Sequence, residues 1–218
     1  MTKDVGSHWE NIYRTKAPDS VSWFRPHLEQ SLSLIERAVP QRTAAIIDVG
    51  AGESTLVDDL LEHGYINLTI LDISQKALAV TRERLGRLAD SVHWICADVT
   101  RPPLPAHFYD VWHDRAVFHF LVQGEERKSY VSAVEHALKP GGHVIVSTFG
   151  SEGPTKCSGL PVVRYDVQKL QTEFGDHFRL IESSKELHST PFGTVQQFLY
   201  CHCQFVPNQL GESLTGTG

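Results

Sequence analysis

Residues 44–54 constrain this chain more than any other stretch, because an apolar run there stops abruptly at the turn Gly50-Ala51-Gly52. Apolar residues at helical spacing follow between positions 56 and 61. The pattern predicts a buried strand, a tight turn and the start of a helix, which is one half of a βαβ unit. Glycine suits such a turn because it tolerates positive φ and lets a ligand approach the backbone closely.

Acidic residues follow the next three predicted strands. Asp72 closes the apolar run 68–71, Asp98 follows the run 92–96, and Asp114 follows the run 109–112. An acid at the end of the second strand is placed to accept hydrogen bonds from two ribose hydroxyls. A Gly-x-Gly turn alone is weak evidence, but three acids at strand ends after it indicate a nucleotide site.

The ordered motifs are residues 47–54, 71–72, 97–99 and 138–142, the last reading Leu-Lys-Pro-Gly-Gly. As a set they resemble the motifs of class I S-adenosylmethionine-dependent methyltransferases, over about residues 44–205. The resemblance implies S-adenosylmethionine as cofactor and S-adenosylhomocysteine as its product. It also implies a Rossmann-like, doubly wound α/β fold with seven strands in the order 3-2-1-4-5-7-6, strand 7 being antiparallel.

A nicotinamide dinucleotide domain is the main alternative for the glycine turn. Its fingerprint needs a third glycine three positions after the second, where helix and strand touch, and this chain has Thr55 there. The resemblance implies instead that Asp48 and the Gly50 carbonyl hold the ammonium group of S-adenosylmethionine, at the turn that Gly52 completes. The simpler interpretation of Asp48 is an acid satisfied within the turn.

The resemblance also implies how the nucleoside is held. Asp72 accepts hydrogen bonds from the ribose, Asp98 and Val99 meet the adenine, and Ile73 packs on the adenine face. Simpler interpretations stay open: Asp72 caps the helix that begins near Ser74, Asp98 serves a surface turn, and Ile73 is a core residue.

Strand and helix patterns alternate along the chain, which favours a parallel sheet covered on both faces. The expected strands span 44–49, 68–71, 92–96, 109–113, 143–149, 178–187 and 195–205. The expected helices span 7–13, 27–39, 54–63, 74–85, 125–138 and 167–174. We expect an N-terminal helical cap or lid (1–40), a methyltransferase domain (41–205) and a mobile tail (206–218).

The end of the fourth strand, Trp-His-Asp-Arg-Ala at 112–116, falls where class I enzymes approach the methyl group. It is distantly similar to the Trp-Asp-Arg-Gly-Ala stretch of thiopurine methyltransferase-like enzymes, with His113 inserted and Ala116 in place of glycine. That departure prevents any transfer of substrate class. Three roles stay open for His113: it acts as a base, it orients the acceptor next to the cofactor, or it is a packed structural residue. Asp114 assists catalysis, caps a helix or steadies Arg115.

Aromatic residues of the N-terminal segment predict a lid that dries the site. Tyr13 and Trp23 would contact the cofactor, Tyr13 at the methionine carboxylate, whereas Trp9 and Phe24 would contact the acceptor. The alternative is an aromatic staple that holds the N-terminal helices to the core. Within the loop 150–165, Cys157, Arg164 and Tyr165 are further candidates for binding the acceptor.

Cysteine raises the alternative of a metalloid acceptor, because thiolate-rich class I enzymes methylate arsenite. Cys157 lies in the expected acceptor loop, but Cys201 and Cys203 lie well down the last strand and share one face of it as ordinary packing positions. We therefore expect no three-thiolate site and no metal.

Composition restricts the remaining possibilities. The 218 residues carry a formal net charge of −6, which argues against binding nucleic acid. The chain has neither the roughly 20 consecutive apolar residues needed to span a bilayer nor an N-terminal signal core, and its four cysteines suit a reducing cytoplasm. We predict a cytoplasmic methyltransferase with a small-molecule acceptor; a protein lysine acceptor and a non-catalytic regulatory protein are the alternatives.

Overall fold

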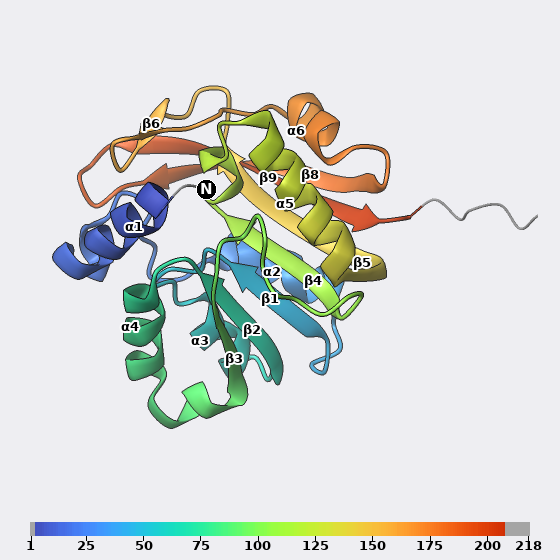
Figure 1. The fold of residues 1–218 in the computed structure, drawn as a ribbon, viewed down its shortest axis with the longest axis horizontal. Coiled ribbons are helices and arrows are strands. Elements are labelled where there is room, and N and C mark those ends of the chain that lie inside the picture. The colour runs from blue at the N-terminus through green and yellow to red at the C-terminus, as the bar shows by residue number, and fades with distance from the viewer. Residues whose placement is uncertain (1–2, 208–218) are drawn as a thin grey trace, which may run out of the picture.

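A seven-stranded sheet forms the centre of the computed structural model, which describes residues 3–207 (Figure 1). Its strand order is β3-β2-β1-β4-β5-β9-β8. The strands are β1 (Ala45–Val49), β2 (Asn67–Asp72), β3 (Val92–Cys96), β4 (Tyr109–Arg115), β5 (Leu138–Phe149), β8 (Phe178–Ser189) and β9 (Val195–Phe205). Strands β1 to β5 pair in parallel, whereas β9 is antiparallel to both β5 and β8. The predicted order, with its antiparallel seventh strand, is confirmed.

Helices cover both faces of the sheet (Figure 1). They are α1 (Lys3–Thr15), α2 (Glu29–Ala38), α3 (Leu56–Glu62), α4 (Gln75–Leu85), α5 (Gly124–Ala137) and α6 (Val167–Phe174), with 3₁₀ turns η1 (Pro18–Ser20), η2 (Gly86–Ser91) and η3 (Phe118–Phe120). One core cluster joins the sheet to α2, α3 and α4, and a second joins it to α5 and α6. Two buried faces explain why the central strands are apolar throughout.

Most elements match the expected ranges, and the exceptions have local causes. Strand β5 begins at Leu138 because Leu138 pairs with Tyr109 before a bulge shifts the register to the pair Val111 and His143. The loop 150–165 contains a short hairpin, β6 (Lys156–Cys157) and β7 (Leu160–Pro161). Residues 208–218 of the expected tail lie outside the described residues.

The glycine turn after β1 has the backbone conformation that its sequence requires. Gly50 has φ +60° and Gly52 has φ +56°, both in the left-handed region. A Cβ on Gly50 would overlap the side chain of Val117, which follows β4. The turn is therefore restricted to glycine by its backbone and, at Gly50, also by its neighbour.

The N-terminal segment is tied to the sheet domain at several points. Helix α1 lies beside α4 (Figure 1), where the Glu10 carboxylate accepts hydrogen bonds from Ser74 Oγ at 2.7 Å and from the Lys76 amide at 3.2 Å. Before α2, His27 Nδ1 lies 2.8 Å from Asp59 Oδ1 of α3. The segment thus lies over the end of the sheet that carries the glycine turn.

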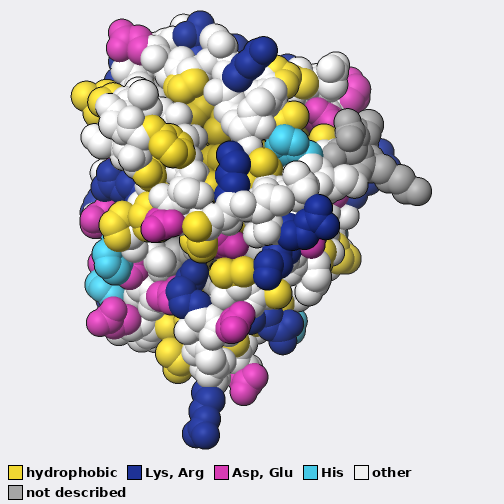
Figure 2. Space-filling view, turned by 90° about the vertical axis from the view of Figure 1, so that its left-hand side faces the viewer, with side chains coloured by type: hydrophobic (Ala, Val, Ile, Leu, Met, Phe, Trp, Pro, Cys, Tyr) yellow, Lys and Arg dark blue, Asp and Glu magenta, His cyan; other side chains and the backbone are white. Residues whose placement is uncertain are grey.

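Charges of both signs are interspersed on the face that α1 and α4 form (Figure 2), so that face carries no field of a single sign. In the span from residue 3 to residue 207, no helix combines the length and the apolar character that crossing a membrane requires.

Replacing Gly50 with alanine should destabilise the fold more than the same change at Gly193, which has φ +76° and open space where a Cβ would stand. Both variants incur backbone strain of about 1–2 kcal/mol, and Gly50→Ala adds about 1–3 kcal/mol of overpacking against Val117. Urea unfolding of the two variants measures the difference. Equal losses of stability would show that Val117 yields without cost.

Candidate functional site

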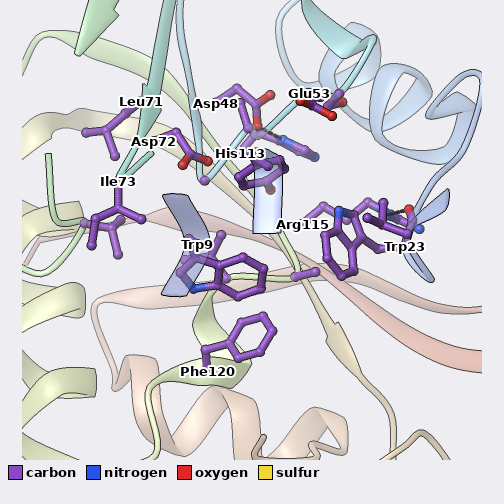
Figure 3. Close-up of a pocket in the computed structure, with 18 of the residues that line it drawn as sticks. Trp9, Trp23, Asp48, Glu53, Leu71, Asp72, Ile73, His113, Arg115 and Phe120 are labelled. Carbon is purple, nitrogen blue, oxygen red and sulfur yellow. Dashed lines mark hydrogen bonds and ion pairs between the residues drawn. The ribbon is translucent and has the colours of Figure 1, made fainter. Parts of the chain in front are cut away.

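A cavity lies where the ends of β1, β2 and β4 meet the N-terminal segment. Carboxylates line one side of it and aromatic rings the other (Figure 3). The predicted site residues that line the cavity are Trp9, Tyr13, Trp23, Phe24, Asp48, Gly50, Asp72, Ile73, Val99, His113 and Cys157. The predicted site residues outside its lining are Gly52, Asp98, Asp114, Arg164 and Tyr165.

Asp48 on β1 pairs with His113 on β4 in the centre of the sheet. Both side chains are buried, and Asp48 Oδ1 lies 2.7 Å from His113 Nδ1. On the other side of the ring, His113 Nε2 lies 2.9 Å from Ser31 Oγ of α2. Both ring nitrogens therefore have partners within the protein.

The hydrogen bonds continue beyond Ser31. Ser31 Oγ lies 3.5 Å from Tyr200 Oη, and Arg115 Nε donates to Tyr200 Oη at 3.1 Å. Two directions are fixed by chemistry: the Asp48 carboxylate accepts from His113 Nδ1, and the Tyr200 hydroxyl accepts from Arg115 Nε. In the two contacts of Ser31 Oγ, with His113 Nε2 and with Tyr200 Oη, either partner can donate. This arrangement, which we call the Asp48–Arg115 chain, links a buried carboxylate to a guanidinium through His113, Ser31 and Tyr200.

Asp72 closes β2 and binds the glycine turn. Its Oδ2 accepts from the Gly52 amide and its Oδ1 from the Ser74 amide, each at 2.8 Å. Burial raises the pKa of Asp72 to about 6, against the effect of these two hydrogen bonds. Each carboxylate oxygen has lone pairs to spare, so both oxygens keep the capacity to accept from a ligand. The helix cap itself is supplied by Ser74, whose Oγ accepts from the Ala77 amide.

Asp98 forms a turn after β3. Its Oδ1 accepts from the Thr100 amide at 2.9 Å and from Thr100 Oγ1 at 2.8 Å. Its neighbour Val99 lines the cavity together with Ile73. The turn that Asp98 forms thus presents an apolar side chain to the cavity.

Asp114 is directed away from the cavity, because successive residues of a strand face opposite sides of the sheet. Its carboxylate accepts hydrogen bonds from Tyr130 Oη at 2.7 Å and from the Val117 amide at 2.9 Å. Burial raises the pKa of Asp114 to about 6, against the effect of the hydrogen bond from Tyr130. Asp114 therefore shapes the turn after β4 and fastens α5 to the sheet.

The aromatic side of the cavity combines separate elements. Trp9 of α1 packs edge to face against Trp23, with ring centroids 5.7 Å apart, and against Phe120 of η3, at 5.0 Å. Tyr13 is buried against Gly52, where an added Cβ would overlap its hydroxyl. These rings close the cavity opposite the strand ends (Figure 3).

The cysteines divide between two parts of the core. Cys157 lines the cavity, and burial raises the pKa of its thiol to about 11. Cys201 and Cys203 pack in the cluster beneath α5 and α6, where burial raises the pKa of each to about 12. Among residues 3–207, no group of three or more His, Cys, Asp or Glu side chains is placed to hold a metal ion.

Arg164 and Tyr165 lie in the loop after β5. Arg164 Nη1 donates to a backbone carbonyl of the same loop at 3.3 Å. Tyr165 is buried against Phe118, with ring centroids 5.6 Å apart.

Several side chains at the site were not among the predicted site residues. Arg115, Glu53 and Phe120 line the cavity, and Ser31 stands behind His113. Strand alternation provides a signal for Arg115, because it lies two residues after His113 and so shares its face of β4. Ser31 has no such signal, because its role depends on how α2 packs against β4.

Comparison with known proteins adds a family match over the middle of the chain. Residues 47–146 match the family model described as "Methyltransferase domain". The chain is 23% identical over 146 residues to the eEF1A lysine and N-terminal methyltransferase of Bos taurus, covering 66% of this chain and 20% of that protein. It is 25% identical over 153 residues to the ubiquinone biosynthesis O-methyltransferase of Dechloromonas aromatica (strain RCB), covering 69% of this chain and 64% of that protein. The chain thus spans about a fifth of the bovine relative and under two thirds of the bacterial one.

A solved structure of similar shape is the 1,6-didemethyltoxoflavin-N1-methyltransferase of Burkholderia thailandensis, with bound 1,6-didemethyltoxoflavin and S-adenosylhomocysteine. The TM-score is 0.71 at 18% identity, covering 93% of this chain and 87% of that one. At this identity the likeness shows the fold.

Proposed function

The chain belongs to the class I S-adenosylmethionine-dependent methyltransferase family, and from that premise we propose that it transfers the methyl group of S-adenosylmethionine to a small-molecule acceptor. The observation that supports this most is the division of the cavity between strand-end carboxylates and aromatic rings (Figure 3). Such a cavity suits a cationic donor on one side and an apolar acceptor on the other.

The residues at the strand ends fit the donor. Gly50 turns the backbone with positive φ beside the cavity, and Asp72 presents a buried carboxylate with lone pairs to spare. We propose that Asp72 binds the ribose hydroxyls, while Val99 and Ile73 contact the adenine. Asp98 supports the adenine contact in two ways: it forms the turn that presents Val99, and its carboxylate oxygens are acceptors near the adenine. The glycine turn would adjoin the amino-acid end.

We further propose that Asp48 binds the ammonium group of the donor, together with the Gly50 carbonyl, and that His113 positions Asp48. A general base needs a free lone pair within reach of the acceptor, and both nitrogens of His113 are already engaged. In this proposal Asp114 assists catalysis indirectly, by shaping the turn after β4.

The donor supplies a methyl group on a positively charged sulfur, so the reaction needs alignment and a dry site more than a protein acid. We propose that Trp9, Phe24 and Cys157 line the acceptor's side, while Tyr13 reaches the methionine carboxylate and Trp23 closes the site above the donor. Tyr13 and Cys157 are buried and the other three side chains are partly buried, which supports the exclusion of water. Arg164 and Tyr165 would shape the acceptor loop from behind.

A protein lysine acceptor is the second candidate, favoured by the similarity to a eukaryotic relative named for lysine and N-terminal methylation. The bacterial relative named as an O-methyltransferase favours the small molecule.

Calorimetry with S-adenosylhomocysteine, followed by labelled methyl transfer into a cell extract split by size, tests the function. We expect binding, and turnover with the small-molecule fraction. Turnover with the macromolecular fraction alone would favour the lysine candidate, and binding without turnover would favour a regulatory protein. No binding of this nucleoside beside tight binding of a nicotinamide dinucleotide would reject the proposal.

Acidic pH should weaken binding of S-adenosylhomocysteine through Asp72. Because the pKa of Asp72 is raised to about 6, the carboxylate that accepts from the ribose is progressively lost as the pH falls through that value. The dissociation constant should rise about tenfold from pH 7.5 to pH 5. In Asp72→Asn, affinity should be lower at neutral pH and nearly independent of pH over this range. An unchanged slope in that variant would reject the assignment.

A truncated ligand should isolate the role of His113. 5′-Methylthioadenosine keeps the nucleoside and sulfur of S-adenosylhomocysteine but lacks the amino-acid end. His113→Ala should weaken S-adenosylhomocysteine about tenfold, since it leaves Asp48 without its charged hydrogen bond, and should spare 5′-methylthioadenosine. Asp72→Asn is the control, expected to weaken both ligands. Equal losses for both ligands in His113→Ala would contradict the positioning role.

A further inference from the structure

The charged side chains of the cavity are separated by sign. Asp48, Glu53 and Asp72 line it at the strand ends and the glycine turn. Within the described part of the chain, the other charged residues that line the cavity are Arg25, which follows Phe24, and Arg115, which ends β4 and contacts the Trp23 carbonyl. An acceptor on the aromatic side therefore meets guanidinium groups and no lining carboxylate.

Arg115 is nearly enclosed, with its side chain 6% exposed. Its Nε donates to Tyr200 Oη at 3.1 Å and its Nη1 to the Trp23 carbonyl at 3.0 Å. Its Nη2 is buried without a hydrogen-bond partner, and Glu186 Oε2, 3.9 Å away, also lacks one. A buried donor left unpaired is costly, so a ligand oxygen that reached Nη2 would satisfy it.

The second charge on this side is already neutralised. Arg25 pairs with Glu29 at 2.9 Å and with Glu186 Oε1 at 3.1 Å. Glu186 therefore serves Arg25 with one oxygen and stands beyond hydrogen-bond distance of Arg115 with the other. Arg115 shares Glu186 in a longer ion pair, at 3.9 Å, and keeps Nη2 as a donor without a hydrogen bond.

The walls beside Arg115 are flat rings held in place by backbone contacts. Arg115 donates to the Trp23 carbonyl, and His188 Nε2 donates to the neighbouring Ser22 carbonyl at 2.8 Å, so the backbone that carries Trp23 is held at two points. Trp9 packs edge to face against both Trp23 and Phe120 (Figure 3). Edge-to-face and offset contacts with such rings favour a planar aromatic guest.

We propose, resting on the methyltransferase function above, that the acceptor is a planar aromatic molecule whose oxygen substituent accepts a hydrogen bond from Arg115, and that cationic amines are excluded. The acceptor's lone pair forms the new bond to the methyl carbon while the carbon–sulfur bond breaks and its electron pair remains on sulfur. A phenolate or another acceptor with a free lone pair needs no base, which agrees with the full engagement of His113.

Four probes of similar size separate flatness from charge: 4-hydroxybenzoate, phenol, benzylamine and cyclohexanecarboxylate. Each is titrated into the full chain saturated with S-adenosylhomocysteine, with tryptophan fluorescence and calorimetry as readouts. We expect 4-hydroxybenzoate to bind about tenfold more tightly than benzylamine or cyclohexanecarboxylate, with phenol between. Benzylamine or cyclohexanecarboxylate binding as tightly as 4-hydroxybenzoate, or no probe binding, would overturn the proposal.

Glu186→Gln is expected to tighten binding, and damage to the fold would weaken it instead. Removing the carboxylate charge nearest Nη2 should tighten 4-hydroxybenzoate about threefold to tenfold and leave phenol unchanged. Glu29→Gln, which changes the exposed partner of Arg25, is the matched control and should change neither. Unaltered or weaker 4-hydroxybenzoate binding in Glu186→Gln would overturn the role of Arg115.

The same titrations separate the two levels of the argument. If S-adenosylhomocysteine fails to bind, the methyltransferase function fails and this inference falls with it. If it binds and the preference among the four probes is absent, the function stands and the acceptor class alone is rejected.

Discussion

The pairing of Asp48 with His113 is the constraint on which the site depends. A carboxylate buried in the middle of a parallel sheet is costly unless a hydrogen-bonding partner meets it, and Asp48 is 4% exposed. His113 meets it from the neighbouring strand and then needs a partner for its other nitrogen, which Ser31 supplies. One buried acid at the glycine turn thereby requires a hydrogen-bonding side chain on β4 and a second one on α2.

This requirement joins the N-terminal segment to the rest of the fold. The Asp48–Arg115 chain passes through Ser31 of α2 and ends at a guanidinium that also holds the Trp23 carbonyl. Helix α2 also packs into the core cluster on its face of the sheet, and the aromatic segment before it is tied to the sheet by the hydrogen bond from Arg115 to the Trp23 carbonyl. Helix α1 is held separately, because its Glu10 carboxylate accepts hydrogen bonds from Ser74 Oγ and the Lys76 amide at the start of α4.

Local pattern predicted the fold well, because apolar strands and glycine turns are set by nearby residues. The sheet order came from the motif resemblance and is confirmed by the pairing of β5, β9 and β8. The surroundings of Asp72 also follow from its position at a strand end. The hydrogen-bond partners beyond His113 could not be predicted from the sequence. Ser31 and Tyr200 lie far from His113 in the sequence, and only the packing of α2 and β9 brings them near it. Strand alternation separates Asp114 from Arg115, and applying it along β4 would have assigned Arg115 to the cavity.

Electrostatics connects the two sides of the cavity. Burial raises the pKa of Asp72, and repulsion from the nearby Asp48 charge raises it further. Burial also raises the pKa of Glu53. Carboxylates in such a position gain from a cationic ligand, because it restores the stabilisation that water no longer provides. The cofactor of this family carries that positive charge at both its ammonium and its sulfonium. The aromatic side lacks lining carboxylates, so a second cation there would face Arg115 and the donor together. Charge separation within one cavity thus favours a cationic donor and, opposite it, a neutral or anionic acceptor.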